Sequence, residues 1–102
     1  VVVLTHEERL DVPALTAALA AETFYVGAIG SRRTQEKRRE RLLEAGVSED
    51  ELERISGPAG LDLGAHTPGE TAVSILGEIL AVRAGRAGGR LREGSGRIHS
   101  TA

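Results

Sequence analysis

A glycine followed by a serine and two arginines is the part of this sequence best suited to binding a charged ligand. Residues Tyr25–Ile29 form an apolar run of strand length, Gly30 ends it, and Ser31 opens a segment of helical composition. Such a strand-to-helix corner presents free backbone amides, which bind anions. Ser31 is a good N-cap residue, and Gly30 can adopt a positive φ or let a ligand approach the backbone closely.

Arg32 and Arg33 follow directly, in the first turn of the predicted helix. The helix dipole is positive there, so each cation is disfavoured by about 0.3–1 kcal/mol. A bound anion relieves this repulsion, and we therefore predict a phosphate or carboxylate site at this corner. The alternative is that both arginines are simply solvated, as exposed arginines often are.

Two more groups are expected near this corner. His6 follows the first strand-like run, and the carboxyl ends of parallel strands form the ligand-binding edge of an open α/β sheet. The segment Gly57–Ala65 is punctuated by glycines and contains one acid, Asp62. Gly60 lets a ligand approach the backbone. The alternatives are that His6 donates to a nearby carbonyl, and that Gly60 and Asp62 only serve tight turns.

The composition argues against several classes of function. A net charge of −2 and 2% aromatic residues do not favour nucleic-acid binding. Without cysteine there is no disulfide, thiolate metal site or cysteine nucleophile. His66 and His99 lack partners at metal-ligand spacing, and nothing marks Ser31 or His6 as an activated catalytic group. We expect a cytoplasmic protein with no membrane-spanning segment.

Strand-like runs are found at Val1–Thr5 and Phe24–Ile29, and a third, very short strand is predicted around Arg54–Ser56. Continuous apolar runs are typical of parallel strands covered by helices on both faces. Because the chain opens without methionine and already inside a strand-like run, we interpret it as a piece of a longer protein. The outer edge of Val1–Thr5 is then unpaired and uncharged, so we predict self-association or aggregation through it.

The helices separating these strands are predicted from their caps. Asp11 is expected to cap the first helix, with Pro13 in its first turn and an end near Glu22. The second helix is expected from Arg32 to about Ala45, with Gly46 at its C′ position.

Two capping-box patterns follow. Ser48 and Glu51 predict a short helix, and Thr67-Pro68-Gly69-Glu70 is the strongest helix start in the sequence. This last helix is expected to end near Ala84 and to be buried, because it is apolar almost all round. Residues 85–102 are rich in Gly, Arg and Ser and predict a flexible tail.

Alternating strands and helices predict the α/β class with a parallel sheet of two or three strands. Two or three strands make half of a doubly wound, three-layer Rossmann-like fold. The G-x-G-x-x-G fingerprint is absent, and the glycines Gly27 and Gly30 have a different spacing.

Four motifs occur in order over about residues 1–83, namely Thr5-His6 with Leu10-Asp11, Tyr25–Arg33, Gly57–Ala65 and Thr67–Ile79. Together they resemble the XdhC/CoxF family of maturation factors for xanthine and carbon monoxide dehydrogenases. The matched region looks like the second half of the family's C-terminal Rossmann domain, so residues 1–84 are expected to form that half domain. Gly77 stands where we expect a residue such as alanine.

The resemblance implies an accessory protein that is not an enzyme. Family members are associated with binding molybdenum cofactor (molybdopterin), with its sulfuration, and with its delivery as chaperones to a xanthine dehydrogenase-type molybdoenzyme. A cysteine desulfurase and a second copy of the chain are further expected partners, whereas nucleic acid and membranes are not. The expected cofactor-binding residues are His6, Gly27, Gly30, Ser31, Arg32, Arg33, Gly60 and Asp62.

Two other readings stay open. The chain is alternatively the nucleotide-binding portion of an NAD(P)-dependent oxidoreductase, since Rossmann-like folds bind dinucleotides at the same edge. The last alternative is a structural fragment that retains no ligand.

Overall fold

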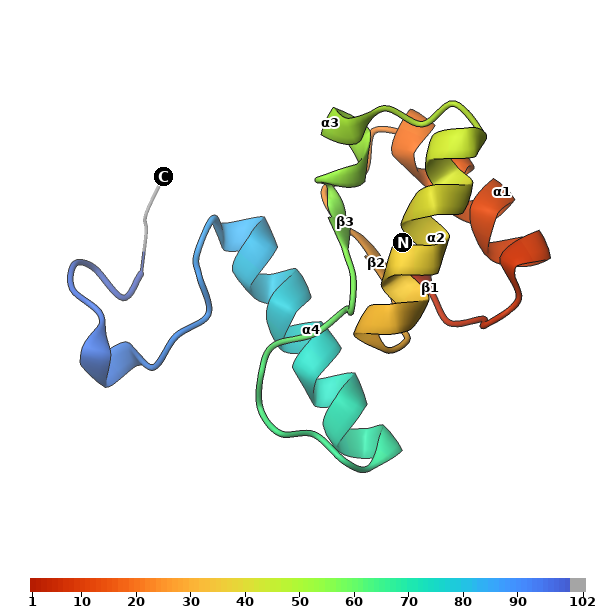
Figure 1. Cartoon of the computed structure of the whole chain (residues 1–102). Coiled ribbons are helices and arrows are strands. Elements are labelled where there is room, and N and C mark those ends of the chain that lie inside the picture. The colour runs from red at the N-terminus through yellow and green to blue at the C-terminus, as the bar shows by residue number, and fades with distance from the viewer. Residues whose placement is uncertain (100–102) are drawn as a thin grey trace.

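The computed structural model describes residues 1–99, which form an α/β fold on a three-stranded parallel sheet (Figure 1). Its strands β1 (Val2–Val3), β2 (Val26–Ala28) and β3 (Ile55–Ser56) lie in the order β1-β2-β3. Val2 is in register with Gly27, and Val26 is in register with Ile55. The predicted α/β class and parallel sheet are confirmed.

All three strands are no longer than three residues, so the predictions for the first two were too long. Leu4 and Phe24, which were expected inside strands, are 64% and 60% exposed. A strand requires a hydrogen-bonded neighbour along its length, and these residues lie beyond the paired registers of β1 and β2. The apolar pattern predicted where strands occur but not how far the pairing extends.

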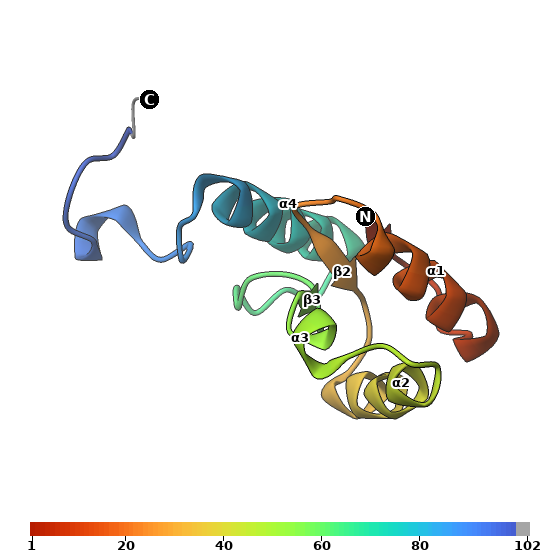
Figure 2. The ribbon, with the colours of Figure 1, turned by 90° about the horizontal axis from the view of Figure 1, so that it is seen from above.

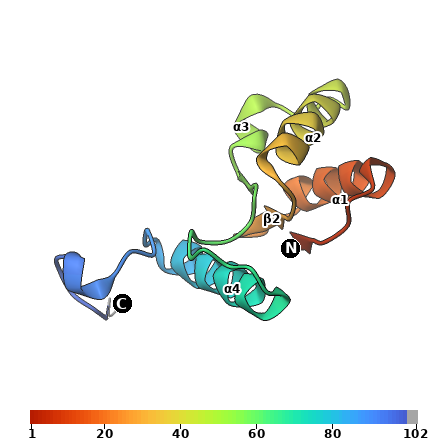
Figure 3. The same ribbon diagram turned by 60° about the horizontal axis from the view of Figure 1, so that its bottom comes forward.

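Helices cover both faces of the sheet, which gives the expected three layers. α1 (Glu8–Ala20) and α2 (Arg32–Glu44) lie on one face, and α4 (Pro68–Ala84) lies on the other (Figures 2 and 3). The short helix α3 (Glu49–Leu52) precedes β3, and a 3₁₀ turn, η1 (Leu91–Glu93), lies in the tail. Residues 85–99 are all exposed, and residues 100–102 of the predicted tail lie outside the described part of the chain.

The helix starts predicted from capping boxes are confirmed. Ser48 and Thr67 each accept a hydrogen bond from the backbone amide three residues later. In turn, the Glu51 and Glu70 carboxylates each accept one from the backbone amide of the cap residue. Ser31 caps α2 by accepting from the Thr34 amide at 3.1 Å.

The start of α1 was wrongly predicted. Asp11 is not its cap, because the helix already begins at Glu8 and ends at Ala20, and Pro13 lies beyond its first turn. The Asp11 carboxylate is instead buried against α2, where it pairs with Arg38. The local cap pattern was overridden by a partner 27 residues away.

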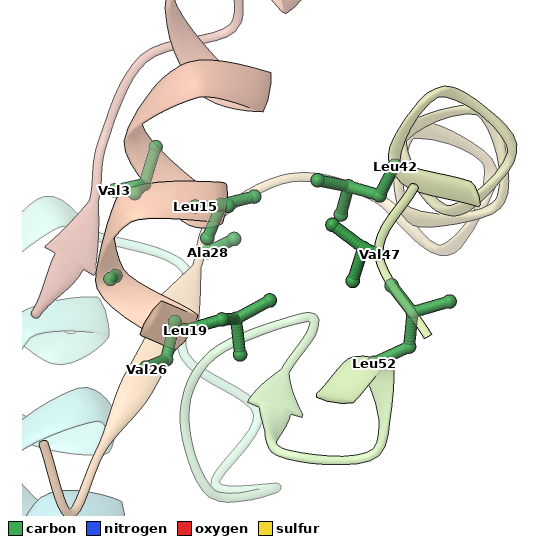
Figure 4. Packing of buried hydrophobic residues seen from close by; sticks show 9 residues of the cluster. Val3, Leu15, Leu19, Val26, Ala28, Leu42, Val47 and Leu52 are labelled. Atoms are coloured by element: carbon green, nitrogen blue, oxygen red, sulfur yellow. The ribbon is translucent and has the colours of Figure 1, made fainter. Parts of the chain in front are cut away.

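The hydrophobic core lies between the sheet and the layer of α1, α2 and α3 (Figure 4). Its buried side chains come from both strands and helices and are Val3, Leu15, Ala18, Leu19, Val26, Ala28, Leu42, Val47 and Leu52. Fully buried Leu15 and Leu42 join α1 and α2 to the sheet.

α4 is not buried all round, contrary to prediction. Its only buried residues are Ser74 and Ile75, whereas Val73, Leu76 and Leu80 are 61%, 60% and 53% exposed. A 17-residue helix is about 25 Å long, but three strands at about 4.8 Å spacing are a narrow support. The helix therefore rests on the sheet by one stripe and leaves its outer apolar residues uncovered within residues 1–99.

Candidate functional site

A pocket of about 410 Å³ lies beyond the carboxyl ends of β2 and β3. Three segments form it, namely the end of the β2–α2 corner, the loop after β3 and the start of α4. The lining residues are Ile29, Gly30, Pro58, Ala59, Leu61, Asp62, Leu63, Gly64, Ala65, Thr71 and Ser74. Its position is where open α/β sheets bind ligands.

The pocket brings together two of the predicted site residues, Gly30 and Asp62. Gly30 has a φ of 126°, and Gly60, in the same loop as Asp62, has a φ of 116°. Both values lie where L side chains are strained, so both positions need glycine. A Cβ on Gly60 would also collide with the Ser74 hydroxyl. Conformation therefore requires these two glycines even without a ligand.

Ser31, Arg32 and Arg33 lie at the exposed start of α2, next to Gly30. Within residues 1–99, neither Arg32 nor Arg33 has a carboxylate within 4.0 Å. Arg32 lines a separate groove of about 400 Å³ on the other side of Pro58, between α2 and the α3–β3 segment.

His6 and Gly27 are placed differently from the other site residues. His6 is exposed in the segment between β1 and α1 and does not line the pocket. Gly27 is buried in the middle of β2, where a Cβ would lie 2.7 Å from Cε1 of Tyr25. The Tyr25 ring thus covers Gly27 on the face of the sheet toward α4.

Sequence reasoning missed the residues of α4 that hold the pocket loop. Glu78 Oε1 accepts from the Tyr25 hydroxyl at 2.6 Å and from the Gly60 amide at 3.1 Å. Burial and the nearby Glu78 carboxylate raise the pKa of Tyr25. An acid within an otherwise apolar stretch of helix was the sequence signal that could have revealed Glu78.

Ser74 makes the second attachment between α4 and the loop. Its hydroxyl donates to the Leu61 carbonyl at 2.6 Å, and its own carbonyl accepts from the Leu61 amide at 3.2 Å. Gly77 faces the same residue, because a Cβ there would lie 3.0 Å from Leu61 Cδ1. The glycine found where alanine was expected thus lets Leu61 lie close against α4.

A buried polar cluster at the end of β2 was also missed. Arg38 Nη2 donates to Asp11 Oδ2 at 2.8 Å, and both side chains are at least 97% buried. Arg38 Nη1 donates to the Ile29 carbonyl and to Gln35 Oε1. Asp11 Oδ1 is buried without a partner in the described residues. A charged helix with a single buried arginine gave no sequence signal for this pairing.

The chemistry available in the pocket is recognition by hydrogen bonds. Its one acidic side chain is that of Asp62, and the Thr71 and Ser74 hydroxyls and the loop backbone supply the other polar atoms. A carboxylate accepts hydrogen bonds and favours a ligand edge rich in N–H donors. No group of three metal-ligating side chains is found among residues 1–99. The described helices also include none with the length and apolarity to cross a bilayer.

The fold resembles that of a solved structure. A crystal structure of a xanthine dehydrogenase from Bacillus halodurans has a TM-score of 0.63 and 27% identity, covering 91% of this chain and 25% of that one.

Two proteins of Escherichia coli (strain K12) are similar in sequence. The molybdenum cofactor insertion chaperone PaoD is 39% identical over 83 residues, which are 81% of this chain and 26% of PaoD. The uncharacterized protein YqeB is 34% identical over 93 residues, which are 91% of this chain and 17% of YqeB. The chain therefore spans about a quarter of PaoD and less of YqeB.

Residues 1–79 match the family model of the XdhC Rossmann domain, which agrees with the four motifs, the parallel sheet and the pocket at its carboxyl edge. The chain belongs to the XdhC family.

Proposed function

We propose that this chain binds molybdenum cofactor as cargo, and thereby aids its sulfuration and its insertion into a xanthine dehydrogenase-type molybdoenzyme. The proposal is supported by the names of two similar proteins, the molybdenum cofactor insertion chaperone PaoD and the xanthine dehydrogenase from Bacillus halodurans. In this proposal the chain is an accessory protein of the cytoplasm, and the reaction chemistry belongs to its partners. A cysteine desulfurase supplies the sulfur, and a second copy of the chain is a further partner.

The single observation that carries the proposal is that Asp62 lines the same pocket as Gly30, and that the N-terminus of α2 begins next to Gly30. Molybdopterin has a pterin ring, whose amino-pyrimidine edge is rich in N–H donors, and a terminal phosphate. The Asp62 carboxylate suits the first group. The start of α2, with Ser31, Arg32 and Arg33, suits the second.

The remaining predicted site residues have supporting roles in this proposal. Gly60 allows the positive φ that the loop requires, and Gly27 leaves room for the Tyr25 ring that covers it. His6 lies after the end of β1, on the same edge of the sheet, and is available to a part of the ligand that extends out of the pocket.

The proposal is tested by anaerobic titration of the chain with molybdenum cofactor and, in parallel, with NAD(H). Asp62→Asn is expected to weaken cofactor binding about tenfold, since a charge-assisted hydrogen bond is weakened. Asp50→Asn, which removes an exposed acid of α3, is the matched control and should bind as the parent does. Binding of NAD(H) alone would favour the oxidoreductase alternative, and binding of neither would favour the structural fragment.

A further inference from the structure

The side chain of Gln35 lies between the ends of β2 and β3, behind the pocket. Its Nε2 donates to the carbonyl oxygens of Ala28 at 3.3 Å and Ile29 at 3.1 Å, and lies 3.5 Å from that of Gly30. Directly after β3, a Cβ on Gly57 would collide with Gln35 Oε1. One side chain of α2 is therefore in contact with both segments that follow the strands.

Arg38 fixes the orientation of the Gln35 amide. Its Nη1 donates to Gln35 Oε1 at 2.9 Å, and its Nη2 is held by the buried Asp11 carboxylate at 2.8 Å. A guanidinium only donates, so Gln35 must turn its oxygen toward Arg38 and its NH₂ group toward the carbonyls. Because Asp11 and Arg38 are almost completely buried, this arrangement is protected from water.

Gln35 binds the carbonyls of one wall of the pocket directly, and on the other side it lies against Gly57, the residue before the second wall. Ile29 and Gly30 form one wall, and Pro58 and Ala59 form another. The Ala59 amide donates to the Ala28 carbonyl at 3.0 Å, which is the same oxygen that Gln35 reaches from behind. Gln35 itself lines the groove on the far side of Pro58 and not the pocket.

We propose that Gln35, oriented by Arg38, is a positioning residue that sets the spacing of these two walls and so determines affinity for the ligand. It acts without touching the ligand. This inference rests on the proposed binding of molybdenum cofactor only for the identity of the ligand. The spacing of the two walls is a property of the chain alone and can be measured without a ligand.

Two variants at position 35 isolate the role of the amide. Gln35→Glu keeps the shape of the side chain and the acceptor for Arg38 but removes the donor to the carbonyls. Gln35→Met keeps the length without any strong polar atom or buried charge, so it remains informative if the glutamate variant does not fold. Lys37→Met is the matched control, because Lys37 is an exposed residue of the same helix.

The first measurement is hydrogen exchange of the Ala59 amide in the ligand-free chain, with circular dichroism to verify folding. Both Gln35 variants are expected to exchange this amide about tenfold faster than the parent, the effect of losing a supporting hydrogen bond. Lys37→Met should exchange like the parent. Unchanged exchange in Gln35→Met would overturn the proposal.

The second measurement is the affinity for molybdenum cofactor, determined anaerobically well below the melting temperature of each variant. The Gln35 variants are expected to bind about tenfold more weakly than the parent and Lys37→Met. Faster exchange with unchanged affinity would overturn the positioning role, because Gln35 would then be structural only. If the parent binds no cofactor, the proposed function fails, and the exchange of Ala59 alone decides the claim about the walls.

Discussion

The Tyr25 hydroxyl donates to Glu78 Oε1 across 2.6 Å, which joins the residue directly before β2 to α4 over 53 positions of sequence. The same carboxylate oxygen accepts from the Gly60 amide of the pocket loop. One acid on α4 thus holds both the sheet beneath it and the loop beside it. The pairing connects the stability of the fold to the shape of the pocket.

This pairing predicts that stability falls at alkaline pH. Burial and Glu78 raise the pKa of Tyr25 above its ordinary value of 10.0 in the unfolded chain. The stabilisation is therefore complete below pH 10 and is lost as the pH rises from 10 toward the folded pKa, since the unfolded state releases its proton first. Urea unfolding between pH 8 and about pH 11 measures the loss. Tyr25→Phe should lack the part of this loss that is due to Tyr25. If the unfolding free energy fell equally steeply with pH in both proteins, the assignment to Tyr25 would be contradicted.

Gly27→Ala is expected to destabilise the chain by about 1–3 kcal/mol, the cost of overpacking a buried site. The new Cβ would lie 2.7 Å from both Cε1 and the hydroxyl oxygen of Tyr25, so the ring must move away from Glu78. Gly89→Ala is the control, because a Cβ at Gly89 meets no atom within 4 Å. Thermal melting of both variants checks the expectation. Equal melting temperatures would show that the Tyr25 ring does not require a glycine at position 27.

Asp11→Ala leaves the Arg38 guanidinium buried without its anion and is expected to cost about 3–5 kcal/mol of unfolding free energy. Glu49→Ala is the matched control, since Arg39 and Glu49 also pair at 2.8 Å but are 43% and 72% exposed. That exposed pair is expected to contribute less than about 1 kcal/mol. Urea titrations compare the two, and a similar loss in both variants would contradict the importance of burial.

Phosphate is expected to stabilise the chain through Arg32 and Arg33. Both lie in the first turn of α2, where the positive end of the helix dipole disfavours cations. A bound anion offsets this repulsion. Millimolar phosphate should therefore raise the melting temperature of the parent. The double variant Arg32→Ala and Arg33→Ala should lose that response and be at least as stable as the parent without phosphate. A melting temperature of the parent that does not depend on phosphate would argue against an anion site.

The features that could be predicted from sequence are those decided by near neighbours in the chain. Ser31, Ser48 and Thr67 cap helices because each cap is completed three residues later. The order of strands and helices followed from the same local patterns. Gly30 and Asp62 could be placed at one edge because parallel strands end together there.

The features that could not be predicted depend on partners far away in sequence. Aspartate is a common N-cap residue, but Asp11 instead forms a buried ion pair with Arg38. The apolar residues of α4 indicate a helix that can be buried, yet periodicity does not reveal how wide its support is. His6 follows a strand, as expected, but the loop carries it away from the pocket lining.

The Tyr25–Glu78 pairing also has an optical consequence. The chain contains one tyrosine and no tryptophan, so its intrinsic ultraviolet emission comes almost entirely from Tyr25. A phenol hydrogen-bonded to a carboxylate emits weakly, because the excited ring passes its proton to the acceptor. The folded chain is therefore expected to show weak tyrosine fluorescence, and this fluorescence should increase when α4 separates from the sheet and the hydrogen bond is lost.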